Sequence, residues 1–152
     1  MEIDSTSPKK IIVPNVMVVL LAALSIISIF LPWFAAKGES VSLVNILSYV
    51  GDLTAFDSKA NLLYLLLLIP IFSAVIIGVE MNNNVKVKLW SQIGKIIVFV
   101  INILALVGLI YVQSLLGGTK ATVFEIMGYG YWIALISSVL LLITVFTRKK
   151  MN

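Results

Sequence analysis

Four segments of the chain contain no charged residue, and each is long enough to cross a lipid bilayer as a helix. They are residues 11–36, 60–79, 96–119 and 126–147, and every charged side chain lies between or outside them. A helix needs about 20 apolar residues to span a hydrocarbon core about 30 Å thick. The sequence therefore predicts an all-α integral membrane protein, a four-helix transmembrane bundle.

The composition agrees with a membrane-embedded chain and leaves little room for anything else. Of the 152 residues, 61% are hydrophobic, whereas soluble domains are about 45–50% apolar. The residues outside the four segments are too few for a second soluble domain, so we predict one membrane domain over residues 1–152. Its longest connection is residues 37–59. Segment 11–36 is too long for the apolar part of a signal peptide, and we expect it to remain as a span.

The absence of two residue types restricts the chemistry that this chain could carry out. It has no cysteine and no histidine, which excludes zinc and haem sites built on them and also Ser-His-Asp or Cys-His catalysis. No nucleotide-binding glycine motif or calcium loop occurs, and no two carboxylates fall within one span. We therefore expect no enzymatic activity, no cofactor and no metal.

The positions of the basic residues predict an orientation. Of the 11 Lys and Arg residues, eight lie in the N-terminal tail, in the segment between the second and third spans, or in the C-terminal tail. The positive-inside rule then places both termini and residues 80–95 in the cytoplasm, and residues 37–59 and 117–125 outside. Because the basic residues flank the spans, the net charge of +4 is attributed to topology, and no nucleic-acid partner is expected.

Aromatic residues mark the ends of the predicted spans. Trp33, Tyr131 and Trp132 lie at the predicted outer boundary, and Trp90 lies at the inner one. Amphipathic rings are favoured at the headgroup level. We interpret these four residues as interface anchors.

Prolines and polar residues within the spans predict local structure. Pro32 should bend or end the first span, and Pro70 should kink the second span near its middle. Ser73 is close enough to help satisfy the backbone group that Pro70 leaves unpaired. Asn102 is the most polar side chain deep in any span, so it should form a hydrogen bond with a neighbouring helix.

Small residues and a lysine complete the predicted packing. Ala22 and Ser25 lie in a small-residue stripe of the first span, and Gly108 lies on a small face of the third. Small residues let helices approach closely in lipid. Lys95, which directly precedes the third span, should extend its charge toward the cytoplasmic headgroups.

The predicted outer loop contains an apolar stretch that is too short to span the bilayer. Leu43, Ile46, Leu47 and Val50 recur at helical spacing, which favours a short interfacial helix. Valine-rich alternation leaves an extended hairpin as the alternative. Such a segment must be covered by lipid headgroups, by its own bundle or by another protein, and we interpret the four residues as a candidate partner surface.

Two short motifs carry a resemblance to known proteins. With Leu31-Pro32-Trp33-Phe34 and with Gly128-Tyr129-Gly130-Tyr131-Trp132 opening the last span, the chain resembles small bacterial four-span membrane proteins of uncharacterised function. Its layout is also similar to that of claudin-like tetraspans, although the cysteine pair and the Gly-Leu-Trp part of the claudin motif are missing. The resemblance implies a left-handed antiparallel bundle with crossings near 20° in a bacterial plasma membrane.

These features favour a non-enzymatic membrane protein that acts through protein–protein interaction. It would be an accessory, assembly or immunity-type subunit whose partner is another membrane protein or a second copy of the chain. The alternative is a small oligomeric channel or transporter for an ion or small solute, with Asn102 and Pro70 along its path. A holin-like lesion former is a third hypothesis.

Overall fold

The computed structural model describes residues 16–36, 39–48, 58–82, 88–115 and 126–148. In these ranges the chain is mostly helical, with one small sheet. The helices are α1 (Val16–Ser28), α2 (Leu43–Ser48), the 3₁₀ helix η1 (Ser58–Leu67), α4 (Leu68–Met81), α5 (Lys88–Leu115) and α7 (Tyr129–Arg148). The strands are β1 (Pro32–Ala36) and β2 (Glu39–Ser42).

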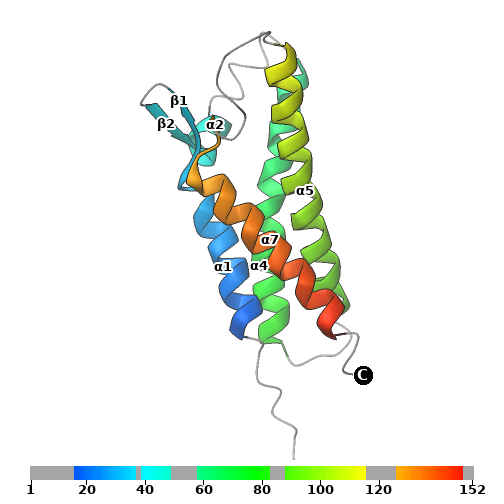
Figure 1. Ribbon diagram of the computed structural model, residues 1–152. Helices are drawn as coiled ribbons and strands as arrows, with labels where there is room; N and C mark the ends of the chain where they lie inside the picture. Colours follow the sequence, from blue (N-terminus) through cyan, green and yellow to red (C-terminus); the bar gives the residue numbers. More distant parts are fainter. Residues whose placement is uncertain (1–15, 37–38, 49–57, 83–87, 116–125, 149–152) are drawn as a thin grey trace, which may run out of the picture.

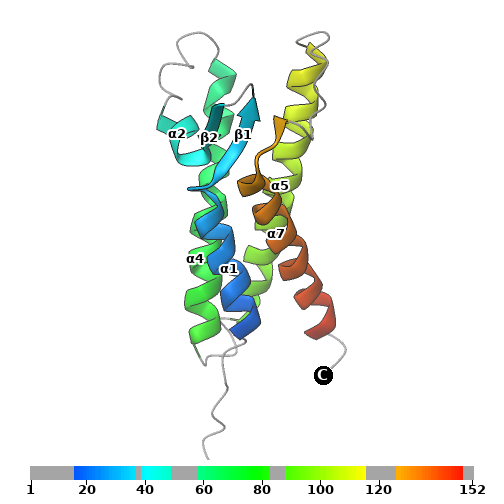
Figure 2. The ribbon, with the colours of Figure 1, turned by 60° about the vertical axis from the view of Figure 1, so that its left-hand side comes forward.

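Helices α1, α4, α5 and α7 pack side by side (Figures 1 and 2). α1 contacts α4 and α7, and α5 contacts the same two helices from the other side. The strands and α2 gather at one end of these helices, which we call the hairpin end, and α7 ends at the opposite end (Figure 1). The buried apolar core runs between the helices and continues into the hairpin end.

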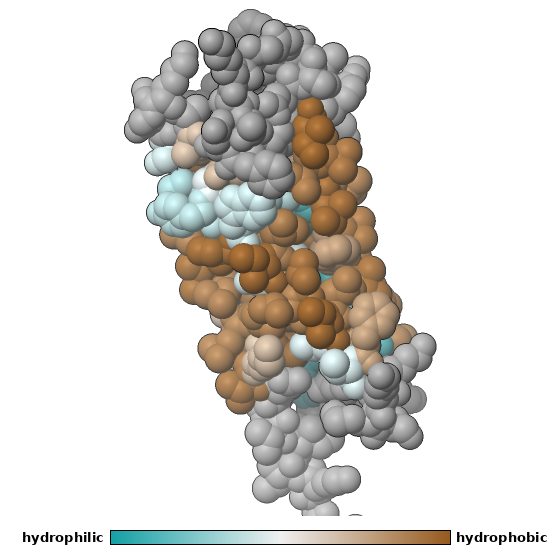
Figure 3. Space-filling view, viewed as in Figure 1, coloured by the Kyte–Doolittle hydropathy of each residue, from teal (hydrophilic) through white to brown (hydrophobic). Residues whose placement is uncertain are grey.

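Among the described residues, three helical stretches are long and apolar enough to cross a membrane: Leu63–Met81, Leu89–Gly108 and Tyr129–Thr147. α1 is a shorter apolar helix of 13 described residues. The outward faces of all these helices are also apolar, with residues such as Leu20, Leu104 and Ile136 more than half exposed. Figure 3 shows this apolar surface along the helices. A surface of this kind is suited to lipid rather than to water.

The first predicted span is helical over only part of its length. α1 ends at Ser28, and residues 32–36 form β1 instead of continuing the helix. The predicted span therefore does not stay helical up to residue 36, and the helix that Pro32 was expected to bend or end stops one turn before it. Pro32 lacks the N–H that a further helical turn would need, and it begins the strand.

Both forms considered for the apolar loop occur, one after the other. β1 and β2 form an antiparallel hairpin, with Phe34 opposite Val41 and Ala35 opposite Ser40. α2 follows directly. An isolated bridge between Phe34 and Met127 joins the segment before α7 to the sheet, so the hairpin is connected to the last helix as well as to the first.

Pro70 lies where the helix type changes. η1 leads directly into α4 at Leu68, which makes Pro70 the third residue of α4. In the first turn of an α-helix a missing N–H costs little. The expected kink within a continuous α-helix is therefore replaced by a junction between a 3₁₀ and an α segment. α5 also begins earlier than expected, at Lys88 rather than at residue 96.

Two glycines let α7 start directly against β1. A Cβ atom at Gly128 would collide with the carbonyl oxygen of Pro32, and one at Gly130 would lie 2.8 Å from the carbonyl oxygens of both Leu31 and Pro32. In the space thus left free, the Gly128 amide donates to the Trp33 carbonyl at 2.8 Å. The hairpin and α7 can approach this closely only because these side chains are absent.

We expect Gly128→Ala to destabilise the protein, because its methyl group meets backbone that has no side-chain freedom to move away. Gly78→Ala is the matched control, since nothing lies within 4 Å of a Cβ there and alanine is favoured over glycine in a helix by about 1 kcal/mol. Thermal unfolding in mild detergent should show a lower Tm for Gly128→Ala and an unchanged or higher Tm for Gly78→Ala. Equal Tm values for the two variants would contradict the close approach.

Candidate functional site

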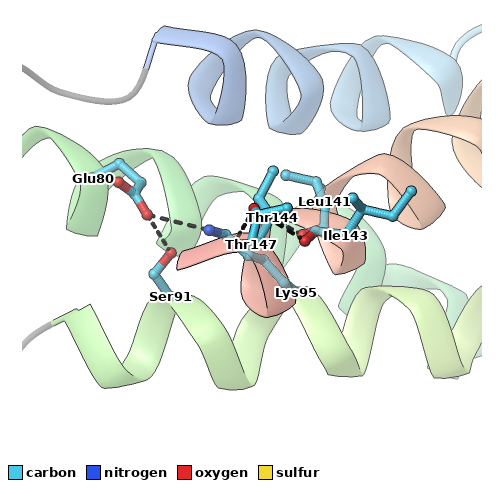
Figure 4. A network of polar contacts seen from close by, with 7 residues as sticks. All are labelled: Glu80, Ser91, Lys95, Leu141, Ile143, Thr144 and Thr147. Carbon is cyan, nitrogen blue, oxygen red and sulfur yellow. Dashed lines mark hydrogen bonds and ion pairs between the residues drawn. The ribbon is translucent and has the colours of Figure 1, made fainter. Parts of the chain in front are cut away.

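A buried ion pair joins α4 and α5 at the end opposite the hairpin. Nζ of Lys95 lies 3.3 Å from Oε1 of Glu80, and each side chain is 1% exposed. Ser91, one turn before Lys95 on α5, donates its hydroxyl to the same carboxylate oxygen at 2.8 Å. Figure 4 shows Ser91 and Lys95 reaching from α5 toward Glu80, near the last turns of α7. This cluster contains the charged side chains buried among the described residues.

The prediction that Lys95 extends toward the headgroups is wrong, because its side chain turns inward to Glu80. The early start of α5 explains the difference: a helix that begins at Lys88 puts Ser91 and Lys95 on one face, four residues apart, and that face packs on α4. The sequence analysis did not predict this contact, because it assigned residues 80–95 to the connection between the second and third spans. The sequence signal that could have revealed it is a carboxylate and a lysine on either side of the short segment between two spans.

Asn102 contributes to the contact between α5 and α7 through its backbone. Its Nδ2 donates to the Val98 carbonyl of its own helix at 2.9 Å, while its own carbonyl accepts a hydrogen bond from the Tyr131 hydroxyl at 3.0 Å. Its Oδ1 is buried and has no hydrogen-bond partner in the described part of the chain. The hydrogen bond to a neighbouring helix is therefore made by Tyr131, not by the Asn102 side chain as expected.

Trp33 and Tyr131 form the centre of the hairpin end. Trp33 is 1% exposed and Tyr131 is fully buried, and their rings meet edge to face with centroids 5.5 Å apart. The indole N–H donates to the Ser28 carbonyl at 2.9 Å, which satisfies one of the carbonyls left unpaired at the end of α1. The protein itself encloses both rings, which were expected to be exposed as interface anchors.

The other two aromatic residues expected at the interface are less enclosed. Trp132 is half-buried and stacks edge to face on Tyr131, with centroids 5.8 Å apart. Trp90 is 61% exposed near the start of α5. Of the four predicted anchors, Trp90 is the one whose ring is mostly exposed and could lie at a headgroup boundary.

The small residues fall into two groups. Ala22 and Ser25 are fully buried on α1. Gly108 is exposed, with no atom within 4 Å of a Cβ built on it, so the expected close packing does not occur there. Gly94 provides it instead: its Cβ would lie 3.1 Å from Ile76 Cγ1 of α4. Sequence reasoning missed Gly94 because it precedes the predicted third span.

Ser73 is fully buried, but its hydroxyl has no hydrogen-bond partner among the described residues. It therefore does not satisfy a backbone carbonyl near Pro70, as the sequence suggested it could. The hydroxyl of Ser25 is likewise buried without a hydrogen-bond partner among these residues.

The predicted partner surface is mostly covered by the protein itself. Leu43 is 1% exposed, and Ile46 and Leu47 pack, partly buried, against the core. Val50 lies outside the described residues. Own-bundle packing, one of the three ways to cover this apolar stretch, accounts for these three side chains. The exposed side of α2 consists instead of Val44, Asn45 and Ser48.

Within the described residues, no three His, Cys, Asp or Glu side chains come together in a way that could hold a metal ion. The buried polar groups described above are the Glu80–Lys95 ion pair with Ser91, the indole N–H of Trp33, the hydroxyls of Tyr131, Ser25 and Ser73, and the side-chain amide of Asn102. Comparison with protein-family models, with curated proteins and with solved structures gives no match. A function for this chain must therefore be inferred from its own geometry.

We expect Lys95→Met to destabilise the protein by about 3–5 kcal/mol, because it leaves the Glu80 carboxylate buried and uncompensated. The double variant Glu80→Gln/Lys95→Met removes both charges and should recover most of that loss. Unfolding in mixed micelles measures both values. A double variant as unstable as Lys95→Met would contradict a mutual neutralisation of the two groups.

Proposed function

We propose that this chain crosses the membrane four times, with the hairpin end outside and both termini in the cytoplasm. The three long apolar helices, together with the apolar face of α1, support four spans. The excess of Lys and Arg in the two tails and in residues 80–95 supports the orientation. The side-by-side arrangement of α1, α4, α5 and α7 fits the tetraspan layout implied by the resemblance.

Single cysteines can test this topology cleanly, because the chain has none of its own. Ser40 on the hairpin and Asn82 at the opposite end are both exposed. We expect a membrane-impermeant maleimide applied to intact cells to label Ser40→Cys and to leave Asn82→Cys unlabelled until the cells are opened. The reverse pattern would contradict the orientation, and labelling of both in intact cells would contradict the number of spans.

We propose further that the protein acts without catalysis, by binding another membrane protein through its hairpin end. The observation that carries this proposal is how firmly that end is fixed to the helices. The Trp33 indole and backbone bind both α1 and the start of α7, and the Val44 amide donates to the Ile29 carbonyl at 3.3 Å.

A simple connection between α1 and α4 would need none of this structure. It would not require a fully buried tryptophan, nor glycines at Gly128 and Gly130 to admit backbone carbonyls. A rigid scaffold that carries exposed side chains on a short element is a common basis for recognition. The fixed hairpin end has this form, with Ser40, Val44, Asn45 and Ser48 exposed on it.

The proposed contact surface is the exposed side of α2, where Val44, Asn45 and Ser48 lie on one face of the short helix. This surface replaces the one expected from the sequence, because Leu43 and its apolar neighbours are used in internal packing. The partner is another membrane protein or a second copy of the chain, for which the protein serves as an accessory, assembly or immunity-type subunit.

A photo-crosslinking amino acid placed at Asn45 or Ser48 in native membranes tests the proposal. We expect a discrete adduct of defined mass from both positions. The matched control positions are Val100 and Ile143, which are similarly exposed on the helices and should contact lipid only. Adducts at the control positions alone, or none at any position, would contradict a partner at the hairpin end.

A double variant of the exposed α2 residues then tests whether the cross-linked partner binds this surface. Val44→Lys/Ser48→Glu should reduce co-purification of the cross-linked partner in mild detergent at least about tenfold while leaving the Tm unchanged, because neither side chain is buried. Full retention of the partner by this variant would place the contact elsewhere and overturn the proposal.

A further inference from the structure

Within the part of the chain that the structure describes, three buried side-chain oxygen atoms on the helices have no hydrogen-bond partner. They are Oγ of Ser25 on α1, Oγ of Ser73 on α4 and Oδ1 of Asn102 on α5. All three residues are fully buried. An unpaired buried polar group lowers stability, and the apolar surroundings of a membrane helix supply no solvent to compensate it.

The two hydroxyls could easily have found local partners. A serine or threonine within a helix can donate to a carbonyl of the preceding turn. Ser28, Ser138 and Thr144 each do so, at 2.6–2.7 Å. Ser25 and Ser73 lie within helices that offer the same carbonyls but do not use them. Their hydroxyls therefore have their hydrogen-bonding capacity free for something other than their own backbone.

The register of α4 and α5 brings two of the three oxygens to one level. The Ser91–Glu80 hydrogen bond and the approach of Gly94 to Ile76 fix the level of the two antiparallel helices. One turn further toward the hairpin end, Ser73 faces the level of Val98. The Asn102 amide reaches back to that level, as its bond to the Val98 carbonyl shows.

Ser25 and Asn102 are each connected to the Trp33–Tyr131 pair of the hairpin end. Ser25 is one turn before Ser28, whose carbonyl accepts the Trp33 indole N–H. Trp33 packs against Tyr131, and the Tyr131 hydroxyl donates to the Asn102 carbonyl. α1 also packs directly on α4.

We propose that Ser25, Ser73 and Asn102 line a hydrated site within the helices and bind internal water there. A buried water needs about two to four polar partners, and the two hydroxyls and the amide oxygen supply that number. The site is electrically neutral. The buried carboxylate nearest along the α4–α5 contact, Glu80, is already bound by Lys95 and Ser91, so its charge is not available to stabilise a dehydrated cation. The hydrated site is independent of any partner at the hairpin end.

The stability of serine-to-alanine variants distinguishes a hydroxyl that binds water from a hydroxyl that has no partner at all. If water occupies the site, Ser73→Ala removes one of its partners and the Tm in detergent should fall. If the oxygen is merely unpaired, the same substitution removes an unsatisfied group and the Tm should rise. Ser138→Ala is the matched control for a buried hydroxyl that has a local partner. A rise in Tm for both Ser73→Ala and Ser25→Ala would overturn the proposal.

Direct detection uses the full chain in lipid bilayers. Solid-state NMR with magnetisation transferred from water should show faster build-up on the Asn102 side-chain amide and on Ser73 than on Ala134, which is equally buried but apolar. Asn102→Leu should slow the transfer to Ser73. Transfer to Asn102 no faster than to Ala134 would contradict hydration. A Tm that rises with Na⁺ or K⁺ in the parent protein but not in Asn102→Leu would identify a cation instead of water, and would overturn the proposal as well.

Discussion

Inside a bilayer a polar group has no solvent to bind, and the structure of this protein depends on how each such group is accommodated. The helices satisfy their own backbone, and their outward faces are apolar. Several buried polar side chains find partners inside the protein. Glu80 binds Lys95 and Ser91, the Trp33 indole binds the end of α1, and the Tyr131 hydroxyl binds the backbone of α5. Each of these contacts joins two elements, so satisfying polar groups also sets the arrangement of the helices.

The two ends of the molecule meet this constraint in different ways. At the end opposite the hairpin, two charges neutralise each other between α4 and α5. Removing one member of such a pair costs more stability than replacing both members with apolar residues. The pair therefore acts mainly to hold α4 and α5 in one register. At the hairpin end no described charge is buried. There an aromatic pair and the glycines before and within the first turn of α7 connect α1, β1 and α7 by neutral hydrogen bonds and close backbone contact. The ion pair holds α4 against α5, and the aromatic pair holds the hairpin end against α1 and α7.

The sequence was sufficient to predict what depends on composition and length. Apolar segments without charge indicated membrane helices, and three of them are long enough in the structure to cross a bilayer. It could not predict which polar residues would face inward. Trp33 looks like an interfacial residue in the sequence, because the hairpin that buries it depends on pairing with residues 39–42 and on contact with Met127, which is distant along the chain. Lys95 looks like a lysine in a loop, because the start of α5 cannot be read from a charge-free window. Leu43 looks like a residue in need of a partner, and its partner is the core itself.

The buried polar groups also restrict how the helices could move. The α4–α5 pair is connected by charge at one end, and α5 is connected to α7 by Tyr131 at its middle, so neither contact can slide without exposing a polar group to lipid. The oxygens of Ser25 and Ser73 and the side-chain oxygen of Asn102 lack partners among the described residues. If the helices simply packed as tightly as possible, the two hydroxyls would turn to their own backbone, as the neighbouring serines do. That they do not is the strongest indication that the middle of the bundle is built around something small and polar that the protein chain itself does not supply.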